Sequence, residues 1–167
     1  MQEAPRYYQT FLTPIGIMEV HADQAFVLQV NLVLSGKKVL VTRKNAVTRK
    51  TGRQLMEYFK GQRKIFDLPL HLKGTTFQKK VWSALARIPY GESRSYGEIA
   101  EEIQNPKACR AVGMANHRNP FMIIIPCHRV IGASKKLVGY APGIKYQEWL
   151  LDFESKARAR STAGGCE

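Results

Sequence analysis

The chain has 167 residues, room for one domain or two small ones. Its hydrophobic share of 44% and charged share of 23% exclude a disordered or collagen-like protein. No apolar run reaches the roughly 20 residues of a membrane-spanning helix, and the N-terminal residues lack the basic and then apolar pattern of a secretory signal. We therefore expect a cytoplasmic protein without membrane contact, or a nuclear one if the source is eukaryotic.

Positive charge dominates the composition. Lys and Arg number 26 against 13 Asp and Glu, which gives a net charge of +13. The excess is spread along the whole chain, and it favours a polyanionic partner, above all nucleic acid. A merely basic, soluble protein is the alternative that charge alone leaves open.

The first third of the chain has the pattern of a small sheet. Residues 7–12, 17–22 and 26–34 are β-branched and aromatic runs separated by turn residues, which predicts strands. Leu55, Met56 and Phe59 then form the apolar stripe of a helix that ends at Gly61. Residues 62–73 have the composition of a connector, so we expect a domain boundary near Gly74.

Beyond Gly74 the pattern becomes helical. Apolar residues recur at helical spacing over 77–88, behind Thr75 and Thr76 as N-cap candidates. Ser95 and Glu98 have the spacing of a capping box, which predicts a helix from there to about Gln104. A further helix is expected over 107–116, with small residues on one side: Ala108, Ala111, Gly113 and Ala115.

Helix, turn and small-faced helix together outline a helix-turn-helix, although two packed core helices have the same outline. We therefore predict an α+β fold with a small β-rich N-terminal domain and a helical C-terminal domain that contains a helix-turn-helix. The expected domains are residues 1–73, with antiparallel strands, and residues 74–154, with the helices, followed by a basic tail over 155–167.

The chemistry is expected after residues 121–125, an apolar run predicted to be a strand. The sequence Pro126-Cys127-His128-Arg129-Val130 follows it directly. A thiolate is the reactive form of cysteine, and a neighbouring imidazole can take its proton. A lone cysteine after an apolar run is more often a buried core residue, but the polar neighbours of Cys127 favour a site. With three cysteines and no C-x-x-C pair, neither a disulfide framework nor a thiolate zinc site is expected.

At this point the sequence resembles the O6-alkylguanine-DNA alkyltransferase family. The resemblance covers about 80 residues, from Gly74 to Glu154, with several separated motifs in the family's order. The motifs are Pro126-Cys127-His128-Arg129-Val130 after Asn119-Pro120, the Gly139-Tyr140 turn, Ser95-Tyr96-Gly97, Asn105-Pro106, Arg110-Ala111-Val112-Gly113 and Trp149-Leu150-Leu151.

The resemblance implies direct reversal of DNA damage. Cys127 would take the alkyl group from O6 of guanine irreversibly, one turnover per protein, and His128 would accept the thiol proton through a water, oriented by Glu154. Tyr140 would supply its phenol to the base, and Asn119 would support the active-site loop. The resemblance implies no cofactor, and we expect no metal ion.

The resemblance also implies how damaged double-stranded DNA is held by a monomer. The target nucleotide would be flipped out of the duplex, with Arg110 replacing the base and Tyr96 crowding the 3′ phosphate. The helix that carries Arg110 would enter the minor groove, where small residues permit close approach. Further contacts to DNA or to the base are expected from Ser95, Ala111, Arg129 and Val130, and phosphate contacts from Lys107, Arg118, Lys135 and Lys136.

The sequence departs from the usual family pattern at a few positions. Pro142 stands where a glycine is usual, which makes the loop over the alkyl group stiffer. Residues 116–118 add polar bulk at the end of the DNA-facing helix. Cys109 is expected to be a packing residue, and Cys166 to be exposed and dispensable.

Three other functions are weighed against repair. An alkyltransferase-like protein that binds lesions without transfer is the main alternative, but such relatives lack the acceptor cysteine. An alkylation-dependent regulator would need a further cysteine-rich domain, and a cysteine hydrolase does not usually have its Cys and His adjacent in sequence.

Overall fold

The structure of the chain is a computed structural model that describes residues 6–38 and 42–164, so the expectation for Cys166 lies outside the described residues. These residues fall into two compact units. Unit 1 contains the chain up to Leu72 together with Pro120–Met122, and unit 2 contains Lys73–Asn119 and the chain from Ile123 onward. The domain boundaries expected from the sequence, after residues 73 and 154, remain predictions.

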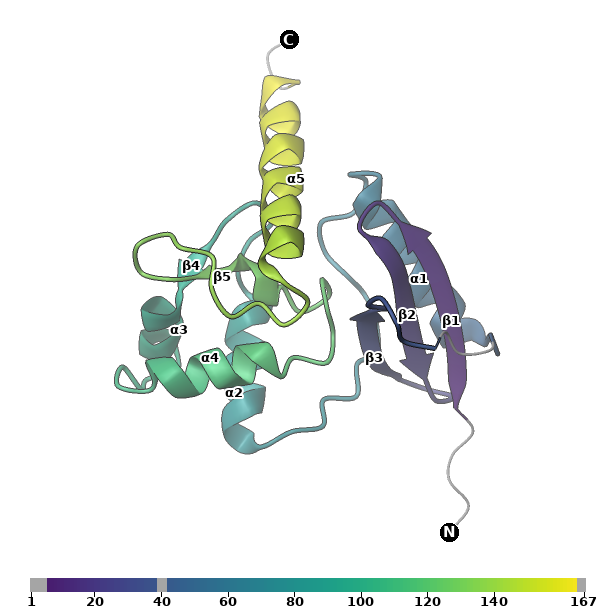
Figure 1. The fold of residues 1–167 in the computed structure, drawn as a ribbon, viewed down its shortest axis with the longest axis horizontal. Helices are drawn as coiled ribbons and strands as arrows, with labels where there is room; N and C mark the ends of the chain where they lie inside the picture. The colour runs from purple at the N-terminus through teal and green to yellow at the C-terminus, as the bar shows by residue number, and fades with distance from the viewer. Residues whose placement is uncertain (1–5, 39–41, 165–167) are drawn as a thin grey trace. The chain divides into compact units, whose positions relative to one another are not determined.

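Unit 1 is a three-stranded antiparallel sheet with one helix against it (Figure 1). The strands are β1 (Tyr7–Thr13), β2 (Gly16–Ala22) and β3 (Val27–Leu32), paired in the order β1-β2-β3. The helix α1 (Ala46–Phe59) contacts all three. The fully buried side chains that join sheet and helix are Met18, Val20, Val27, Val30, Leu55 and Tyr58.

The turn between β1 and β2 depends on Gly16. This glycine has φ of +122°, a conformation that residues with a Cβ rarely adopt. The Thr13 hydroxyl donates to the Gly16 carbonyl oxygen at 2.6 Å and closes the turn. The predicted turn between the strands at residues 7–12 and 17–22 is therefore confirmed.

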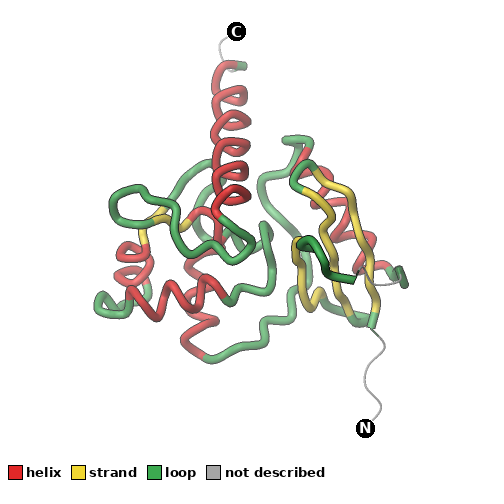
Figure 2. Tube along the Cα trace, in the orientation of Figure 1, coloured by secondary structure: helices red, strands yellow, loops and turns green. Residues whose placement is uncertain are grey.

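Unit 2 is built from helices with one short parallel strand pair. Its elements are α2 (Thr76–Ala86), β4 (Arg94–Ser95), α3 (Tyr96–Glu102), α4 (Cys109–His117), the 3-10 turn η1 (Cys127–Arg129), β5 (Val130–Ile131) and α5 (Ile144–Ala163). Arg94 pairs with Val130 and Ser95 with Ile131, so β5 leads the chain past the start of α3. A long loop without regular structure connects β5 to α5 (Figure 2).

The core of unit 2 fixes the helix-turn-helix. The indole Nε1 of Trp82 on α2 donates to the Ala115 carbonyl oxygen on α4 at 2.9 Å, in a buried position. Val81, Leu85, Ile99, Val112 and Leu150 are fully buried around it. Capping boxes begin α2 at Thr75 and α3 at Ser95, as the sequence predicts for Ser95. The predicted α+β class, with its helix-turn-helix, is confirmed.

One predicted element is wrong. Residues 121–125 are not a strand: Phe121 makes a single bridge to Val30, and the chain then turns through residues 122–124. Ile123 has φ of +72°, a strained value for a β-branched residue, and its side chain is nonetheless buried. An apolar run alone does not distinguish a strand from a buried turn. Within the described residues, no helix has both the length and the apolar character needed to cross a membrane.

Candidate active site

Cys127 begins the turn η1 and is held almost completely inside unit 2. Cys127 is 6% exposed. Its backbone N–H donates to the Ile125 carbonyl oxygen at 2.7 Å. Asn119 Nδ2 also donates to the Ile125 carbonyl oxygen, at 2.8 Å. The amide of Asn119 therefore ties the segment after α4 to the loop that carries Cys127, and its supporting role in the reaction stays a prediction.

His128, which follows Cys127 in the sequence, forms a buried pair with Glu154. Nε2 of His128 lies 2.7 Å from Oε1 of Glu154, and both side chains are fully buried. Because an ionised carboxylate only accepts, the imidazole proton is placed on Nε2. Nδ1 is then an acceptor, and it is buried without a hydrogen-bond partner among the described residues. Glu154 lies in the middle of α5. The structure thus brings together the two residues that the resemblance pairs, and their roles in the reaction stay predictions.

Arg129 completes the ionic cluster, and the prediction that it contacts DNA is contradicted. Its guanidinium binds Glu154 through Nε to Oε2 and through Nη2 to Oε1, both at 2.9 Å, while Nη1 donates to the Ile88 carbonyl oxygen at 2.7 Å. Arg129 is 5% exposed and lies over the Tyr90 ring, 5.5 Å from its centroid. This two-point contact neutralises the carboxylate that orients His128.

The pKa values of the cluster follow from burial and from these contacts. Burial raises the pKa of the Cys127 thiol to about 11, and the Asn119 side chain is the largest of the contacts that oppose it. Burial lowers the pKa of His128, the adjacent Glu154 raises it, and the positive charge of Arg129 lowers it further. Burial acts to raise the pKa of Glu154, but His128 and Arg129 outweigh it and hold that pKa below its usual range. At neutral pH the cluster therefore holds a thiol, a neutral imidazole and a paired carboxylate.

Tyr140 lies beside Cys127, and Val130 follows the turn η1; their roles toward a base stay predictions. Tyr140 is buried, and its hydroxyl lies close enough to Cys127 to lower the pKa of the thiol, although it makes no hydrogen bond of full geometry among the described residues. Burial raises the pKa of Tyr140 well above its usual value, so the phenol keeps its proton. The carbonyl oxygen of Val130 accepts from Gln147 Nε2 at 2.9 Å.

Sequence reasoning missed three residues of this site. Gln147 Nε2 also donates to the His128 carbonyl oxygen at 3.2 Å, and Asn116 Nδ2 donates to the Cys127 carbonyl oxygen at 3.4 Å. Tyr90 lies under Arg129. Each of the three contacts a residue at least 11 positions away in the sequence. Only Asn116 had a sequence signal, the polar character of residues 116–118.

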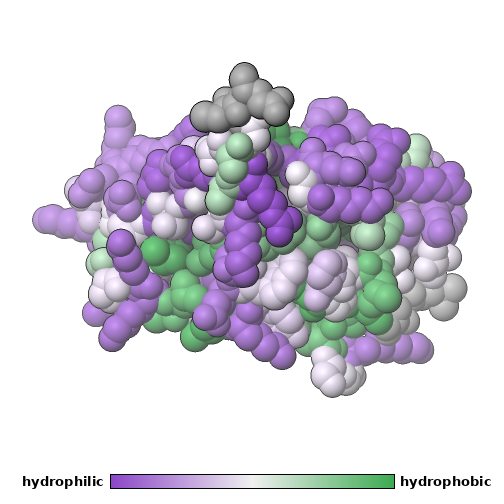
Figure 3. All heavy atoms as spheres, turned by 90° about the horizontal axis from the view of Figure 1, so that it is seen from above, coloured by the Kyte–Doolittle hydropathy of each residue, from purple (hydrophilic) through white to green (hydrophobic). Residues whose placement is uncertain are grey.

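The helix-turn-helix presents the expected DNA-facing residues to solvent. Arg110 and Ala111 are exposed on α4, as are Lys107, Arg118, Lys135 and Lys136 elsewhere in unit 2. Figure 3 looks onto a different face, the one at the C-terminal end of α5, where hydrophilic side chains surround smaller hydrophobic areas. The exposed residues are therefore free to meet a polyanion.

Two expectations for α4 need correction. Ala115 is 2% exposed and packs in the core against Trp82, because the helix turns this position inward, so it is not available for close approach to DNA. Cys109 is exposed rather than a packing residue, since it lies at the start of α4 on the solvent side.

Tyr96 and Ser95 at the start of α3 have contacts of their own. Tyr96 Oη donates to the Val138 carbonyl oxygen at 3.0 Å, which joins α3 to the loop between β5 and α5. Nδ1 of His117 lies 3.1 Å from the next carbonyl oxygen along that loop, that of Gly139. Ser95 is the N-cap, and its Oγ accepts from the Glu98 N–H at 3.1 Å.

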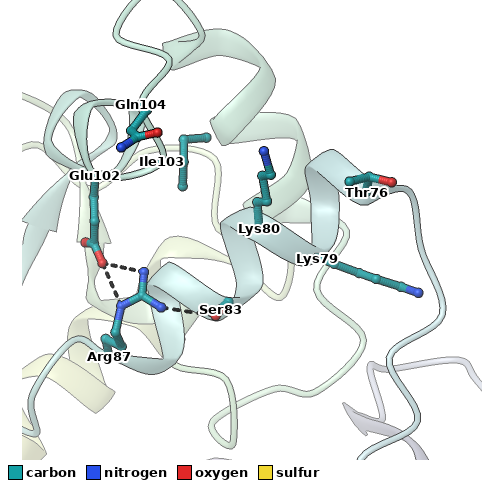
Figure 4. A pocket seen from close by; sticks show the side chains of 8 residues that line it. All are labelled: Thr76, Lys79, Lys80, Ser83, Arg87, Glu102, Ile103 and Gln104. Carbon is teal, nitrogen blue, oxygen red and sulfur yellow. Dashed lines mark hydrogen bonds and ion pairs between the residues drawn. The ribbon is translucent and has the colours of Figure 1, made fainter.

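A separate open pocket of about 460 Å³ lies between α2 and the end of α3 (Figure 4). Arg87 contacts both Glu102 and Ser83 in it, and Lys79 and Lys80 stand on the same helix. None of its lining residues belongs to the cluster around Cys127. Within the described part of the chain, no group of His, Cys, Asp and Glu side chains is arranged to hold a metal ion.

Comparisons with known proteins agree with this geometry. Residues 76–156 match the family model described as 6-O-methylguanine DNA methyltransferase, DNA binding domain. The methylated-DNA–protein-cysteine methyltransferase of Methanosarcina acetivorans is 51% identical over 152 residues, which cover 89% of this chain and 97% of that protein. The chain belongs to this methyltransferase family.

Solved structures of this family have the same fold. The crystal structure of the Mycobacterium tuberculosis O6-methylguanine methyltransferase is 42% identical, with a TM-score of 0.84 over 92% of this chain and 94% of that one. A structure of Mycobacterium tuberculosis OGT in complex with DNA is 44% identical, with a TM-score of 0.82 over 90% and 93% of the two chains. The matched family model spans every candidate site residue from Ser95 to Glu154.

Proposed function

We propose that this methyltransferase repairs DNA by direct reversal, moving the alkyl group from O6 of guanine to Cys127. One observation carries the proposal: His128, directly after Cys127 in the turn η1, is buried with its Nε2 2.7 Å from Oε1 of Glu154. A nucleophile, a base and an orienting carboxylate are the groups that activate a thiol.

The proton has a defined route in this proposal. Because burial holds the pKa of Cys127 at about 11, the thiol must lose its proton as it attacks. Nδ1 of the neutral His128 is the unprotonated ring nitrogen, and one water carries the proton to it. Glu154, held by Arg129, keeps the imidazole in the accepting tautomer and stabilises the imidazolium that forms.

The displacement itself exchanges two bonds. The Cys127 Sγ–carbon bond forms while the carbon–O6 bond breaks, which leaves negative charge on the purine oxygen. The protonated phenol of Tyr140 donates to that oxygen, and the proton that left the thiol finally restores neutral guanine. The products are a thioether on Cys127 and an undamaged base.

One alkyl group per chain follows from the product. A thioether carbon is not displaced by water at a useful rate, and the other described cysteine, Cys109, lies exposed on α4 rather than beside Cys127. The protein is therefore consumed, unless a second nucleophile is supplied from outside.

The DNA is bound by the helix-turn-helix in this proposal. The target base leaves the duplex, since O6 cannot be reached in the stack, and Arg110 on α4 fills the gap. The exposed lysines and arginines of unit 2 bind the flanking phosphates, and the chain acts as a monomer. Its relatives include proteins of archaea and bacteria, and in these organisms the DNA lies in the cytoplasm. We therefore place the activity in the cytoplasm.

The test uses a duplex with a radiolabelled methyl group on O6 of one guanine. The wild-type chain is expected to take up the label, whereas Cys127→Ala binds the same duplex with similar affinity and takes up none. Tight binding by the wild type without label transfer contradicts the proposal and favours the lesion-binding class. Loss of fold in Cys127→Ala is checked by circular dichroism, and Cys127→Ser then replaces it.

A further inference from the structure

The pocket between α2 and the end of α3 is lined mainly by side chains that donate hydrogen bonds. Lys80 extends from α2 toward the end of α3, where Ile103 and Gln104 lie (Figure 4). Thr76 and Ser83 add hydroxyl groups on α2. The side chains of Lys80 and Gln104 have no hydrogen bond or ion pair with the part of the chain that the structure describes. Both are therefore available to a ligand from outside.

The carboxylate in the pocket is already neutralised. Oε1 of Glu102 accepts from Nε of Arg87 at 2.8 Å and lies 2.7 Å from Nη2 of the same guanidinium. Glu102 is the single acidic residue among those that line the pocket, and Lys79 and Lys80 add two further positive charges. The pocket thus carries a net positive charge, which favours an anion.

Gln104 has a backbone conformation that its side chain does not favour. Its φ is +60°, in the left-handed region, where the residue after a helix is usually glycine or sometimes asparagine. A longer side chain costs free energy there, and such strain is found most often where the residue has a function. The amide of Gln104 supplies two N–H donors at the edge of the pocket. A ligand that uses this amide gives the glutamine a reason.

The pocket adjoins the turn of the helix-turn-helix. Gln104 precedes Arg110 by six residues, so their Cα atoms are at most about 20 Å apart. One strand of a duplex rises about 3.4 Å per nucleotide, so this span equals about six base pairs. A duplex that meets Arg110 therefore extends far enough along its axis to reach the pocket.

We propose that this pocket binds one backbone phosphate of the DNA that flanks the lesion, with Lys80 and Gln104 as its donors. The inference rests on the DNA binding in the proposed function, and it does not depend on alkyl transfer. A phosphate diester carries one negative charge and two free oxygens, which match one ammonium and one amide group. Contacts to the backbone set the register of a protein on a duplex. This contact and Arg110 hold the turn from its two ends.

The test measures binding to an undamaged duplex of about 20 base pairs by fluorescence anisotropy over a range of salt concentrations. Lys80→Gln is expected to weaken binding and to lower the slope of log affinity against log salt by about 0.9, the value of one phosphate contact. Gln104→Gly removes an uncharged donor, so it is expected to weaken binding several-fold with the slope unchanged. Lys60→Gln, at the end of α1 in unit 1, is the matched control and is expected to keep the wild-type slope.

A double variant and stability separate this role from a structural one. Because both side chains bind the same phosphate, Lys80→Gln and Gln104→Gly together are expected to weaken binding by less than the product of their separate effects. Glycine adopts a φ of +60° without strain, so the unfolding midpoint of Gln104→Gly is expected to equal or exceed that of the wild type.

Several results overturn the inference while leaving the proposed function intact. These are a wild-type slope in Lys80→Gln, independent effects of the two substitutions, or weaker binding by Gln104→Gly together with a lower unfolding midpoint. Saturable binding of inorganic phosphate with an unchanged DNA slope in Lys80→Gln assigns the pocket to a free anion and also overturns it. Failure of the wild type to accept a methyl group from O6-methylguanine contradicts the proposed function instead, since none of these binding measurements involves transfer.

Discussion

Arg129 shows how one side chain can set the chemistry of its neighbours without touching the substrate. Its guanidinium neutralises Glu154 at 2.9 Å and faces His128 across the carboxylate. Glu154 alone would draw a proton onto the imidazole, and a protonated imidazole cannot accept one from the thiol. The charge of Arg129 opposes that protonation and keeps His128 ready as a base.

Replacing Arg129 by Gln is therefore expected to raise the pKa of His128. Protonated His128 cannot take the thiol proton, so the rate of alkyl transfer falls as the pH is lowered through the pKa of His128. In the variant this fall is expected at a higher pH than in the wild type. A pH–rate profile of single-turnover transfer measures this shift. An acid limb at the wild-type position contradicts the role given to Arg129.

The same substitution leaves Glu154 buried without its cationic partner. Breaking a buried ion pair from one side costs about 3–5 kcal/mol of unfolding free energy. The pH–rate profile of Arg129→Gln is therefore recorded at a temperature at which urea titration shows that this variant is folded.

Arg110 is exposed on α4 and has no part in the buried cluster. Arg110→Ala is expected to slow repair of duplex DNA by about tenfold or more, because the gap left by the flipped base is no longer filled. Reaction with free O6-benzylguanine, which needs no flipping, is expected to be unchanged. Parallel transfer assays on the two substrates measure the difference, and equal losses contradict insertion into the stack.

The elements that were predicted correctly are those whose signals are local. The capping box at Ser95 lies within four residues, and the β1–β2 hairpin is defined by its own turn. The site is less local: the adjacent Cys127 and His128 were candidates from the sequence itself, whereas Glu154, 26 residues beyond His128, came only from resemblance to a family. The contacts of Arg129 with Ile88 and Glu154 could not be predicted, because they join segments far apart in the chain.

The mistake at residues 121–125 has a related cause. Five consecutive apolar residues fit a buried strand by composition, yet Ile123 adopts φ of +72° in a turn. Only the packing around the run distinguishes the two conformations.

A glycine inside a helix can be required by close packing against a neighbouring side chain, which helix propensity does not predict. Gly52 lies inside α1, where alanine is normally better by about 1 kcal/mol. A Cβ at Gly52 would overlap the ring of Phe11 on β1. Gly52→Ala is therefore expected to lower the unfolding free energy by about 1–3 kcal/mol.

Urea unfolding of a double-mutant series checks this cause. In a Phe11→Leu background, which removes part of the ring, Gly52→Ala is expected to be neutral or stabilising. The same loss in both backgrounds shows that the ring is not responsible.

The molecule as a whole is expected to lose stability at both ends of the pH range. His128 and Glu154 have lowered pKa values, so the unfolded chain binds more protons, and stability falls as pH drops below 6.5 and again below 4.5. Cys127 has a raised pKa, so the unfolded chain releases its proton first, and stability falls as pH rises above 9.0. The tyrosines with raised pKa values add to this loss above 10.0.

Urea unfolding at pH 8 and pH 9.8 isolates the contribution of Cys127. The wild type is expected to be less stable at the higher pH, and Cys127→Ala to be nearly unchanged across this window. An equal loss in both proteins assigns the alkaline limb to other groups. Wild-type protein alkylated on Cys127, where no ionisable thiol is then left at that position, is expected to behave like Cys127→Ala.

The central claim is that Cys127 itself receives the alkyl group. Its most direct test is the intact mass of the protein after mixing with a duplex that carries one O6-methylguanine, followed by peptide mapping. The account predicts a single gain of about 14 Da, the mass of a CH₂ group, on Cys127, saturating at one per chain. An unchanged mass in a protein that binds the lesion tightly, or a methyl group on any other residue, contradicts it.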